Sequence, residues 1–399
     1  MILATNVLVL LAVAICMVNN SIVILFGRFV YGMAAGAFTV FVPKYTSELA
    51  PSEYRGPFGA VNQFMCTLGI LACSLLGLAI PSKAGEVAAL DENSFIVQQY
   101  WRVVWGLPAV FVLIQITLML TVFKYETPVT YKQRADYDKM SELFSKIYIK
   151  EQIKMRMDEV QIQQESDHTD EDGNSSLKVS QPSTRDTFCD PNIRRAAWVG
   201  CALSIFQQLS GINAIIFYSS TIFASTGSTL APNTQTALVM AVNCAAVVGS
   251  SFMLNFAGRK SLMFLWTAMC GVFLFFQVAA TISGWGTIEL VMTMAFVAAF
   301  EFAPGPIVWL YMGEILNDKG ISVAVFLNWL FTLVIGLITP FLLKPSVLGG
   351  GTFIMFGVFN ILSCIFIALF MKETKGLSDE QVKYLYRKDR DVIKEFEKQ

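Results

Sequence analysis

The chain consists of long apolar runs separated by short polar segments. The runs are near 20 residues long, the length at which an α-helix crosses the hydrocarbon core of a bilayer. They predict helices over 1–18, 22–43, 57–80, 102–123, 196–218, 235–256, 261–283, 288–312, 321–343 and 351–371. The pattern therefore predicts an all-α polytopic membrane protein with about ten spans.

A polar stretch over residues 124–195 divides the spans into a group of four and a group of six. Within it, residues 136–164 carry apolar side chains at helical spacing between charges, which indicates amphipathic helices. The acidic run 165–174 has the composition of a disordered segment. We therefore expect an N-terminal bundle over 1–123, a linker over 124–195, a C-terminal six-helix bundle over 196–371 and a tail helix over 372–399.

The basic residues predict the orientation in the membrane. Apart from Arg28, Lys83, Arg102 and Lys344, the 29 Lys and Arg residues lie on or beside one side of the predicted spans. Cytoplasmic loops carry an excess of basic residues. The linker and the C-terminus are therefore predicted to be cytoplasmic.

Composition narrows the class of protein. The chain has 399 residues, of which 55% are hydrophobic and 15% charged, and this excludes a soluble domain. A net charge of −1 gives no sign of a nucleic-acid partner. The eight cysteines form no CxxC pair, and no nucleophile–base pair or metal cluster stands out, so neither an enzyme nor a cofactor or metal is expected.

The most informative stretch lies inside the fifth predicted span, where Gln207, Gln208 and Asn213 occur within seven apolar-flanked positions. Polar side chains at membrane depth are costly and face a cavity or a partner helix. On a helix, much of this cluster shares one broad face. An uncharged amide cluster suits a neutral, hydroxyl-rich ligand. The alternative is that these amides only bond neighbouring helices.

A second stretch, residues 300–309, contains two prolines that flank a glycine. Pro304 and Pro306 remove backbone donors and are predicted to interrupt the helix. Broken helices near the midplane are typical of transporter binding sites. Glu301 adds an ionisable group, and Trp309 offers a flat apolar face that suits a sugar ring, although it is equally consistent with ordinary packing.

Single amides recur inside other spans, at Gln63, Asn243 and Asn328. Amides on several spans beside a proline-broken segment indicate that they converge on one polar cavity. Arg28 is a further charge within a span, and Glu301 is one candidate partner for it, because neither charge should be left unpaired in the membrane.

Charged residues also gather at the predicted cytoplasmic ends of the spans. They alternate in sign and include Glu48, Arg55, Glu126, Arg259 and Glu314. As a network they would latch a closed gate, which alternating access requires. As separate, exposed charges each would contribute roughly 0–1 kcal/mol.

Together these motifs resemble the sugar-porter family of the major facilitator superfamily. The resemblance rests on 207–213, on Gly27-Arg28, Glu48 and Arg55-Gly56, and on Gly258-Arg259-Lys260, Pro304-Gly305-Pro306, Asn328-Trp329 and Glu373-Thr374-Lys375-Gly376. The sequences of these motifs are most similar to those of protist hexose transporters of the facilitative type.

The resemblance implies a major facilitator fold with twelve spans in two halves. By motif position the first span here corresponds to the third of the family, so the first two helices are expected to be missing. It also implies roles for individual residues. The substrate-binding candidates are Gln63, Gln207, Gln208, Asn213, Asn243, Glu301, Trp309 and Asn328; the gating candidates are Tyr218, Pro304, Pro306, Glu48, Arg55, Glu126, Arg259 and Glu314.

Three positions depart from the family pattern at the latch. Val129 and Ile321 stand where the family has arginine, and Asn255 stands where it has an acid. We therefore expect a latch with fewer charged contacts, which favours the inward-open state or faster cycling.

The resemblance implies transport of a hexose by alternating access, either as uniport or coupled to protons, in the plasma membrane. The expected partners are a sugar and the lipid bilayer, with no expectation for the oligomeric state. The alternatives are a sugar sensor that does not transport and an inactive, truncated transporter; the short tail disfavours the sensor. An ion channel is disfavoured because the spans lack an acidic ring.

Overall fold

The computed structural model describes residues 1–51, 55–81, 91, 94–154, 157, 183–224, 230–377 and 379–387. The acidic run 165–174 lies outside these residues. The chain divides into two units, which are described separately. Unit 1 comprises Met1–Asn62 and Leu90–Ser180, and unit 2 comprises Gln63–Ala89 and Gln181–Gln399.

The predicted membrane helices are present. Within the described residues, eight helical segments are long and apolar enough to cross a membrane, and two shorter apolar helices cover Ile2–Cys16 and Val61–Gly77. The eight are Ser21–Thr46, Tyr100–Thr121, Arg194–Ala224, Pro232–Leu254, Arg259–Ile282, Gly286–Ile315, Asp318–Leu342 and Gly349–Phe370. These eight and the two shorter helices together coincide with the ten predicted spans, so the expectation of an all-α polytopic membrane protein is confirmed.

Unit 1 contains a small bundle formed by α1 (Ile2–Cys16), α2 (Ser21–Leu49) and α6 (Tyr100–Thr121), preceded by the short α5 (Phe95–Gln98). Its core includes Val9, Val13, Ala34 and Val112. At the bundle's close α1–α2 contact, a Cβ on Gly27 would lie 2.6 Å from the sulfur of Cys16, so a side chain larger than hydrogen would not fit there.

Two further helices of unit 1, α7 (Pro128–Arg134) and α8 (Tyr137–Ile147), lie in the linker, and α8 falls in the part over 136–164 that is expected to be amphipathic. Thr127 caps α7 and Asp136 caps α8 through their side-chain oxygens. Tyr131, Met140, Leu143 and Phe144 form a separate apolar core between them. Asp136 also pairs with Lys139, and this hydrogen bond lowers the pKa of the Asp136 carboxyl.

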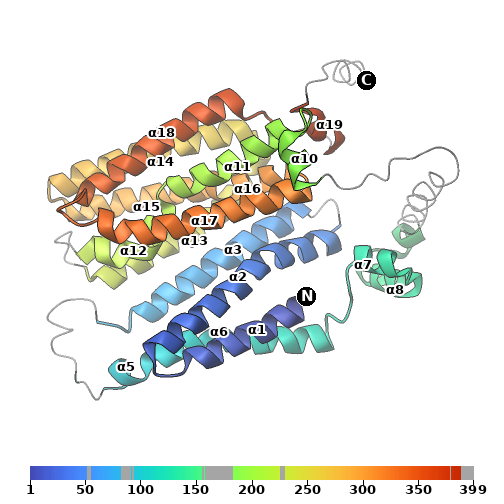
Figure 1. Cartoon of the computed structure of the whole chain (residues 1–399), viewed down its shortest axis with the longest axis horizontal. Coiled ribbons are helices and arrows are strands. Elements are labelled where there is room, and N and C mark those ends of the chain that lie inside the picture. Colours follow the sequence, from blue (N-terminus) through green and yellow to red (C-terminus); the bar gives the residue numbers. More distant parts are fainter. Residues whose placement is uncertain are drawn as a thin grey trace. The chain divides into compact units, whose positions relative to one another are not determined.

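Unit 2 holds most of the helices and the predicted site (Figure 1). It contains the part of α3 (Arg55–Gly77) from Gln63 onward, together with α10 (Thr184–Cys189), α11 (Arg194–Leu209), α12 (Ile212–Ala224), α13 (Pro232–Phe256), α14 (Arg259–Ile282), α15 (Gly286–Phe302), α16 (Pro304–Ile315), α17 (Asp318–Leu342), η2 (Gly349–Gly351), α18 (Thr352–Phe370) and α19 (Asp379–Tyr384). The principal neighbours are α14 with α15 and α18, α11 with α17, and α13 with α15.

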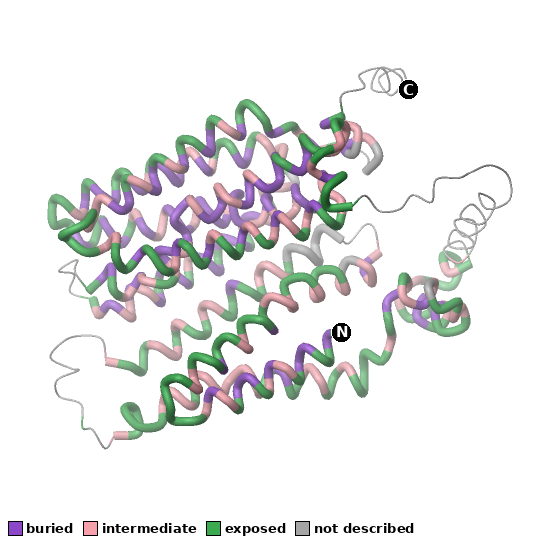
Figure 2. The backbone as a smooth tube through the Cα atoms, viewed as in Figure 1, coloured by how far each residue is buried: buried purple, intermediate pink, exposed green. Residues whose placement is uncertain are grey.

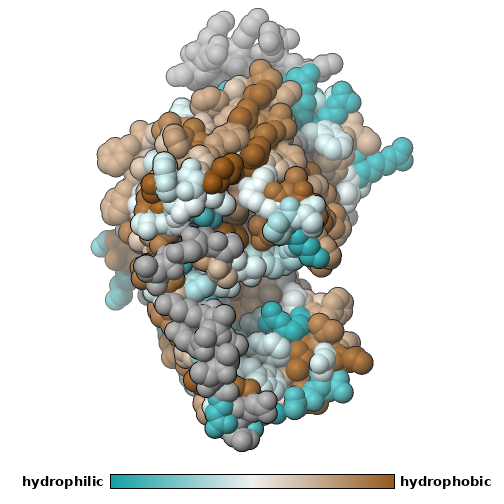
Figure 3. All heavy atoms as spheres, turned by 90° about the vertical axis from the view of Figure 1, so that its left-hand side faces the viewer, coloured by the Kyte–Doolittle hydropathy of each residue, from teal (hydrophilic) through white to brown (hydrophobic). Residues whose placement is uncertain are grey.

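Burial within unit 2 follows a membrane-protein pattern. Buried residues concentrate on α11, α15 and α16 (Figure 2), whereas large apolar side chains such as Phe264, Phe276 and Leu369 are exposed. The space-filling view in Figure 3 shows apolar side chains gathered over the upper part of the surface. Exposed apolar surface of this extent is typical of helices that face lipid.

The predicted span over 196–218 is not one continuous helix. Helix α11 ends at Leu209 and α12 begins at Ile212. Gly211 lies between them with a φ of +94°, in the left-handed region that glycine adopts without strain. The assumption that the amides share one face of a single helix is therefore wrong, because the backbone changes direction between Gln208 and Asn213.

The predicted interruption at the two prolines is confirmed. Helix α15 ends at Phe302 and α16 begins at Pro304, with Ala303 between them in a non-helical conformation (φ −147°, ψ −59°). Proline at the first helical position lacks only an N–H that has no intrahelical partner anyway. Unit 2 therefore contains two broken spans, each interrupted in the middle of an apolar run.

We predict that Gly211→Ala lowers the free energy of unfolding by at least about 2 kcal/mol. The left-handed backbone costs alanine roughly 1–2 kcal/mol, and the added Cβ would lie 2.7 Å from the Phe356 ring. Thermal unfolding of the purified protein in detergent measures the effect. Gly69→Ala is the control, because a Cβ there meets nothing within 4 Å. Equal melting temperatures for the two variants would contradict the prediction.

Candidate functional site

The amides of α11, α12 and α17 form one continuous hydrogen-bonded network. Asn328 Nδ2 donates to Gln207 Oε1 at 2.7 Å, and Gln208 Nε2 donates to Asn328 Oδ1 at 3.0 Å. Asn213 Nδ2 then donates to Gln208 Oε1 at 2.5 Å. Gln207, Gln208 and Asn328 are buried, so each of these bonds replaces one that water would otherwise supply. The break at Gly211 turns α12 so that Asn213 can reach back to Gln208.

The network also connects the two broken spans. Gln207 Nε2 donates to the carbonyl oxygens of Pro304 and Gly305, at 2.9 Å each. These two residues form the first turn of α16, immediately after the interruption. The end of α11 is therefore held against the start of α16 by a side chain rather than by packing alone.

A second polar group surrounds the buried carboxylate of Glu301, which is 3% exposed. Asn243 Nδ2 donates to Glu301 Oε1 at 2.9 Å, and Gln63 Nε2 donates to Oε2 at 3.3 Å. The three side chains come from α13, α15 and α3, all within unit 2. Within the described part of the chain, Asn243 Oδ1 is buried and has no hydrogen-bond partner. It is an acceptor that a ligand hydroxyl could satisfy.

The two aromatic candidates lie on the helices that carry these groups. Trp309 is half-buried on α16, where it packs against an apolar core that includes Ile307 and Val308. Tyr218, on α12, donates its hydroxyl hydrogen to the carbonyl oxygen of Gly336 at 2.5 Å. That contact ties α12 to α17.

Several polar residues of the site lie outside the sequence-based set. Thr332 Oγ1 is 3.5 Å from Asn213 Nδ2, Asn328 also donates to the Ser204 carbonyl, and Asn360 donates to the Ser210 carbonyl. Hydroxyls give a weak signal, because threonine bonds its own helix, as Thr332 does to the Asn328 carbonyl. Glu289 is a further buried carboxyl, near the start of α15, whereas Glu301 lies near the end of that helix.

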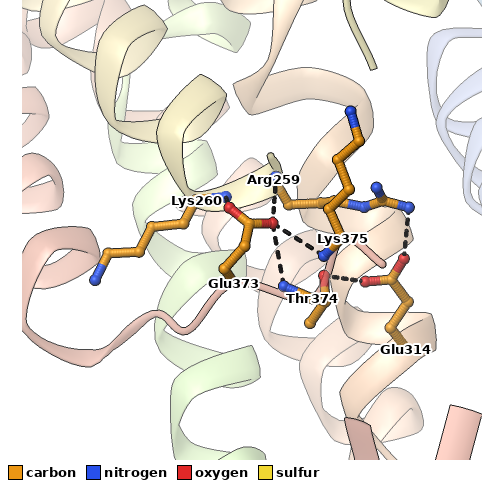
Figure 4. Close-up of polar contacts among 6 residues, drawn as sticks. All are labelled: Arg259, Lys260, Glu314, Glu373, Thr374 and Lys375. Atoms are coloured by element: carbon orange, nitrogen blue, oxygen red, sulfur yellow. Dashed lines mark hydrogen bonds and ion pairs between the residues drawn. The ribbon is translucent and has the colours of Figure 1, made fainter. Parts of the chain in front are cut away.

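Unit 2 contains a separate polar cluster beyond the ends of α14 and α18 (Figure 4). The Glu373 carboxylate accepts hydrogen bonds from the backbone N–H groups of Arg259 at 2.7 Å and Lys260 at 3.1 Å, which begin α14. It also accepts from Thr374 and Lys375. A carboxylate at a helix N-terminus satisfies donors that have no intrahelical partner and interacts favourably with the helix dipole.

Gly258 is required for this cap. A Cβ at Gly258 would lie 2.1 Å from a Glu373 carboxylate oxygen, so any larger residue would displace the carboxylate. Beside the cap, Arg259 pairs with Glu314 at 3.3 Å, and the Thr374 hydroxyl donates to Glu314 at 2.6 Å. The ion pair is about one-fifth exposed on each side, so it contributes less than the buried cap.

The tail helix α19 is anchored to α16. Tyr311 and Tyr386 share a hydrogen bond of 2.6 Å, and the backbone N–H of Lys372 donates to both hydroxyls. Burial raises the pKa of the Tyr386 hydroxyl, which keeps it protonated. The start of the tail therefore packs on the helix that follows the proline break.

The remaining gating candidates lie in unit 1. Glu48 is half-buried in the last turn of α2, and the backbone N–H of Glu126 donates to the Tyr131 hydroxyl just before α7. The side chain of Arg55 lies outside the described residues. Arg28 lies over the rings of Tyr31 and Trp105, with its guanidinium carbon 5.7 and 5.9 Å from the ring centroids.

Comparison with known proteins assigns the fold and then the family. The structure resembles that of XylE, a proton:xylose symporter of the major facilitator superfamily, with a TM-score of 0.72 and 23% identity over 97% of this chain and 82% of that one. The fold is therefore that of the major facilitator superfamily. The family model "Sugar (and other) transporter" matches residues 1–386, and the chain belongs to that family.

Two curated relatives agree with this assignment. Hexose transporter 1 of Toxoplasma gondii is 32% identical over 92% of this chain, and the chain spans 65% of that relative's length. Sugar transporter ERD6-like 6 of Arabidopsis thaliana is 31% identical over 90% of this chain and 71% of its own length. The expected sugar-porter family is confirmed, and its members are described as transporters rather than enzymes.

Proposed function

We propose that this protein transports a hexose across a membrane by alternating access. The observation that carries the proposal is the set of buried, uncharged amides around Gln208 and Asn328, next to a helix interrupted at Ala303. Side-chain amides donate and accept in one plane, as the vicinal hydroxyls of a sugar require. The family and the names of the relatives support a sugar as the substrate.

The hydrogen bonds distinguish direct contacts from positioning residues. Both N–H groups of Gln207 are engaged by the Pro304 and Gly305 carbonyls, and both N–H groups of Asn328 are engaged by Ser204 and Gln207. In this arrangement these two amides offer a sugar only acceptor oxygens.

Gln208, Asn213 and Asn243 have donor or acceptor capacity left over and are the stronger candidates for direct contact. Gln63 and Glu301 complete the set beside Asn243, and Trp309 provides a flat face for the sugar ring.

The wider assignment follows the charge distribution and the relatives. Several apolar helices make this an integral, multi-pass membrane protein. We propose that it lies in the plasma membrane, with its C-terminus and the 124–195 linker in the cytoplasm, because most basic residues lie on that side. XylE is described as a proton symporter, so sugar uptake with and without a pH gradient distinguishes proton coupling from uniport.

The charged cluster of Figure 4 would act as part of a cytoplasmic latch. Arg259 and Glu314 form an ion pair in unit 2, and Glu48, Arg55 and Glu126 are the candidates from unit 1. Tyr218, Pro304 and Pro306 lie at or beside the interrupted helices, where a change of backbone angle would open or close the site.

We predict that Gln208→Ala weakens hexose binding by at least ~1 kcal/mol, about fivefold in Kd. The substitution removes a buried amide. It leaves Asn328 Oδ1 without the donor it has now and leaves Asn213 Nδ2 with only its long contact to Thr332. Equilibrium binding of glucose to the purified protein measures the change. Asn233→Ala is the matched control, because Asn233 donates to the Gly77 and Ile80 carbonyls outside the network. Unchanged binding in Gln208→Ala, or an equal loss in the control, would count against the site.

We further predict that restoring the charges of the latch slows transport and shifts the protein away from the inward-open state. The variant combines Val129→Arg, Asn255→Asp and Ile321→Arg, each at a position where the family carries a charge. Each restored pair adds a contact that has to break in every cycle. The measurements are the uptake rate and the inward-open population, from distances between spin labels. If neither quantity changes, these positions play no part in gating.

A further inference from the structure

An apolar groove runs along the outside of unit 2, between α14 and α18. It has a volume of about 430 Å³ and is lined by apolar residues of the two helices, among them Phe264, Gly271 and Phe275 on α14 and Ile361, Ala368 and Leu369 on α18. The volume lies in the range of small-molecule sites, roughly 300–1,000 Å³. The groove is separate from the amide network, none of whose residues lines it.

Small residues create the groove where two antiparallel helices pack closely. Gly271 approaches the Gly357 carbonyl and the Asn360 Cβ, and the Cys364 thiol lies 3.7 Å from the Phe264 carbonyl. Phe264, Phe275 and Leu369 are exposed and form its walls. From Phe264 to Phe275 the lining of α14 extends roughly 16 Å along the helix axis.

A positively charged side chain, that of Lys260, lies at one end of the groove. Lys260 precedes Phe264 by one helical turn, and its Nζ donates to the carbonyl oxygen of Ala368 at 2.9 Å. Ala368 is itself a lining residue. The ammonium group has three donors, and this contact uses one of them. In Figure 4 the Lys260 side chain extends away from the Arg259–Glu314 pair.

Among the residues that the structure describes, no carboxylate forms an ion pair with Lys260. Glu373 is the nearest carboxylate in the cluster, and its oxygens accept from the four backbone N–H groups of Arg259, Lys260, Thr374 and Lys375. The groove thus combines an apolar lining with a basic side chain at one end.

We propose that this groove binds an anionic phospholipid of the leaflet on the Lys260 side, with one acyl chain along α14 and α18 and the phosphate at Lys260. The acyl chain matches the apolar lining of the groove, and the anionic headgroup matches the lysine at its end. A Lys near an anionic lipid surface contributes ~1 kcal/mol, about fivefold in affinity. In the orientation proposed above, the lipid belongs to the cytoplasmic leaflet.

The test measures lipid binding to the full chain by native mass spectrometry, with phosphatidylglycerol as the anionic probe and phosphatidylcholine as the neutral one. We expect preferential binding of phosphatidylglycerol. Lys260→Ala should weaken it about fivefold and leave phosphatidylcholine unchanged, whereas Lys260→Arg should retain the preference. Lys319→Ala is the control, because Lys319 is an exposed lysine at the start of α17. An unchanged preference in Lys260→Ala overturns the proposal.

A second pair of variants tests the acyl chain. Ala268 lines the groove, so Ala268→Trp should fill it and weaken both lipids, whereas Leu265→Trp on the exposed face of α14 should leave both unchanged. If Ala268→Trp does not fold, photo-crosslinking of the unmutated protein takes the place of this variant. A phospholipid with a diazirine at the end of its acyl chain should then label peptides of α14 and α18. The proposal is overturned if the diazirine labels peptides other than those of α14 and α18, or if Ala268→Trp leaves lipid binding unchanged. It is also overturned if Ala268→Trp disrupts a dimer of this chain and not lipid binding.

Discussion

The hydrogen bonds from Gln207 to the Pro304 and Gly305 carbonyls join the two places where spans of unit 2 are interrupted. Irregular backbone at membrane depth is tolerated only where protein or a watery cavity surrounds it, because lipid cannot hydrogen-bond to it. Each break therefore needs polar partners. Gln207 of α11 supplies them for the Pro304 and Gly305 carbonyls, and Asn360 of α18 donates to the Ser210 carbonyl beside Gly211. Gln207, a member of the cluster that is proposed to bind sugar, therefore also stabilises the break at Ala303.

This double role connects the proposed site with the proposed motion. An interrupted helix absorbs a change of backbone angle at lower cost than a continuous one. A ligand that competes for the donors or acceptors of Gln208 and Asn213 changes the balance of contacts at both breaks. It therefore has a physical means of favouring one arrangement of the helices over another, as a population shift requires. Tyr386, which follows α19, is hydrogen-bonded to Tyr311 of α16. The tail therefore packs on the helix that begins at the proline break.

The sequence predicted the fold class and the position of the spans, because a run of about 20 apolar residues has few structural alternatives. It also predicted the break at Pro304 and Pro306, where proline removes specific donors. It did not predict the break at Gly211, because a single glycine inside an apolar run is tolerated in a helix. Its left-handed conformation and its close approach to Phe356 are seen only in the tertiary structure.

The same distinction holds for the site. Residue type and depth identified Gln207, Gln208 and Asn243 as candidates, since buried amides are costly. Asn328 was one of several single amides in the sequence and is a central member of the network, bonded to both glutamines. Pairings between α11, α16 and α17 depend on helix packing that no local pattern encodes. The role of Glu373 as a cap on α14 likewise depends on a contact over more than 100 residues.

The central claim is that buried amides recognise individual sugar hydroxyls, and a thermodynamic cycle tests it most directly. Binding of glucose and of its singly deoxygenated analogues is measured for the protein and for Asn243→Ala, which removes the buried Oδ1 that lacks a partner within the described residues. We predict that at least one missing hydroxyl weakens binding to the protein by ~1 kcal/mol or more. The same loss should nearly disappear in the variant. Equal costs for every analogue in both proteins would contradict the account.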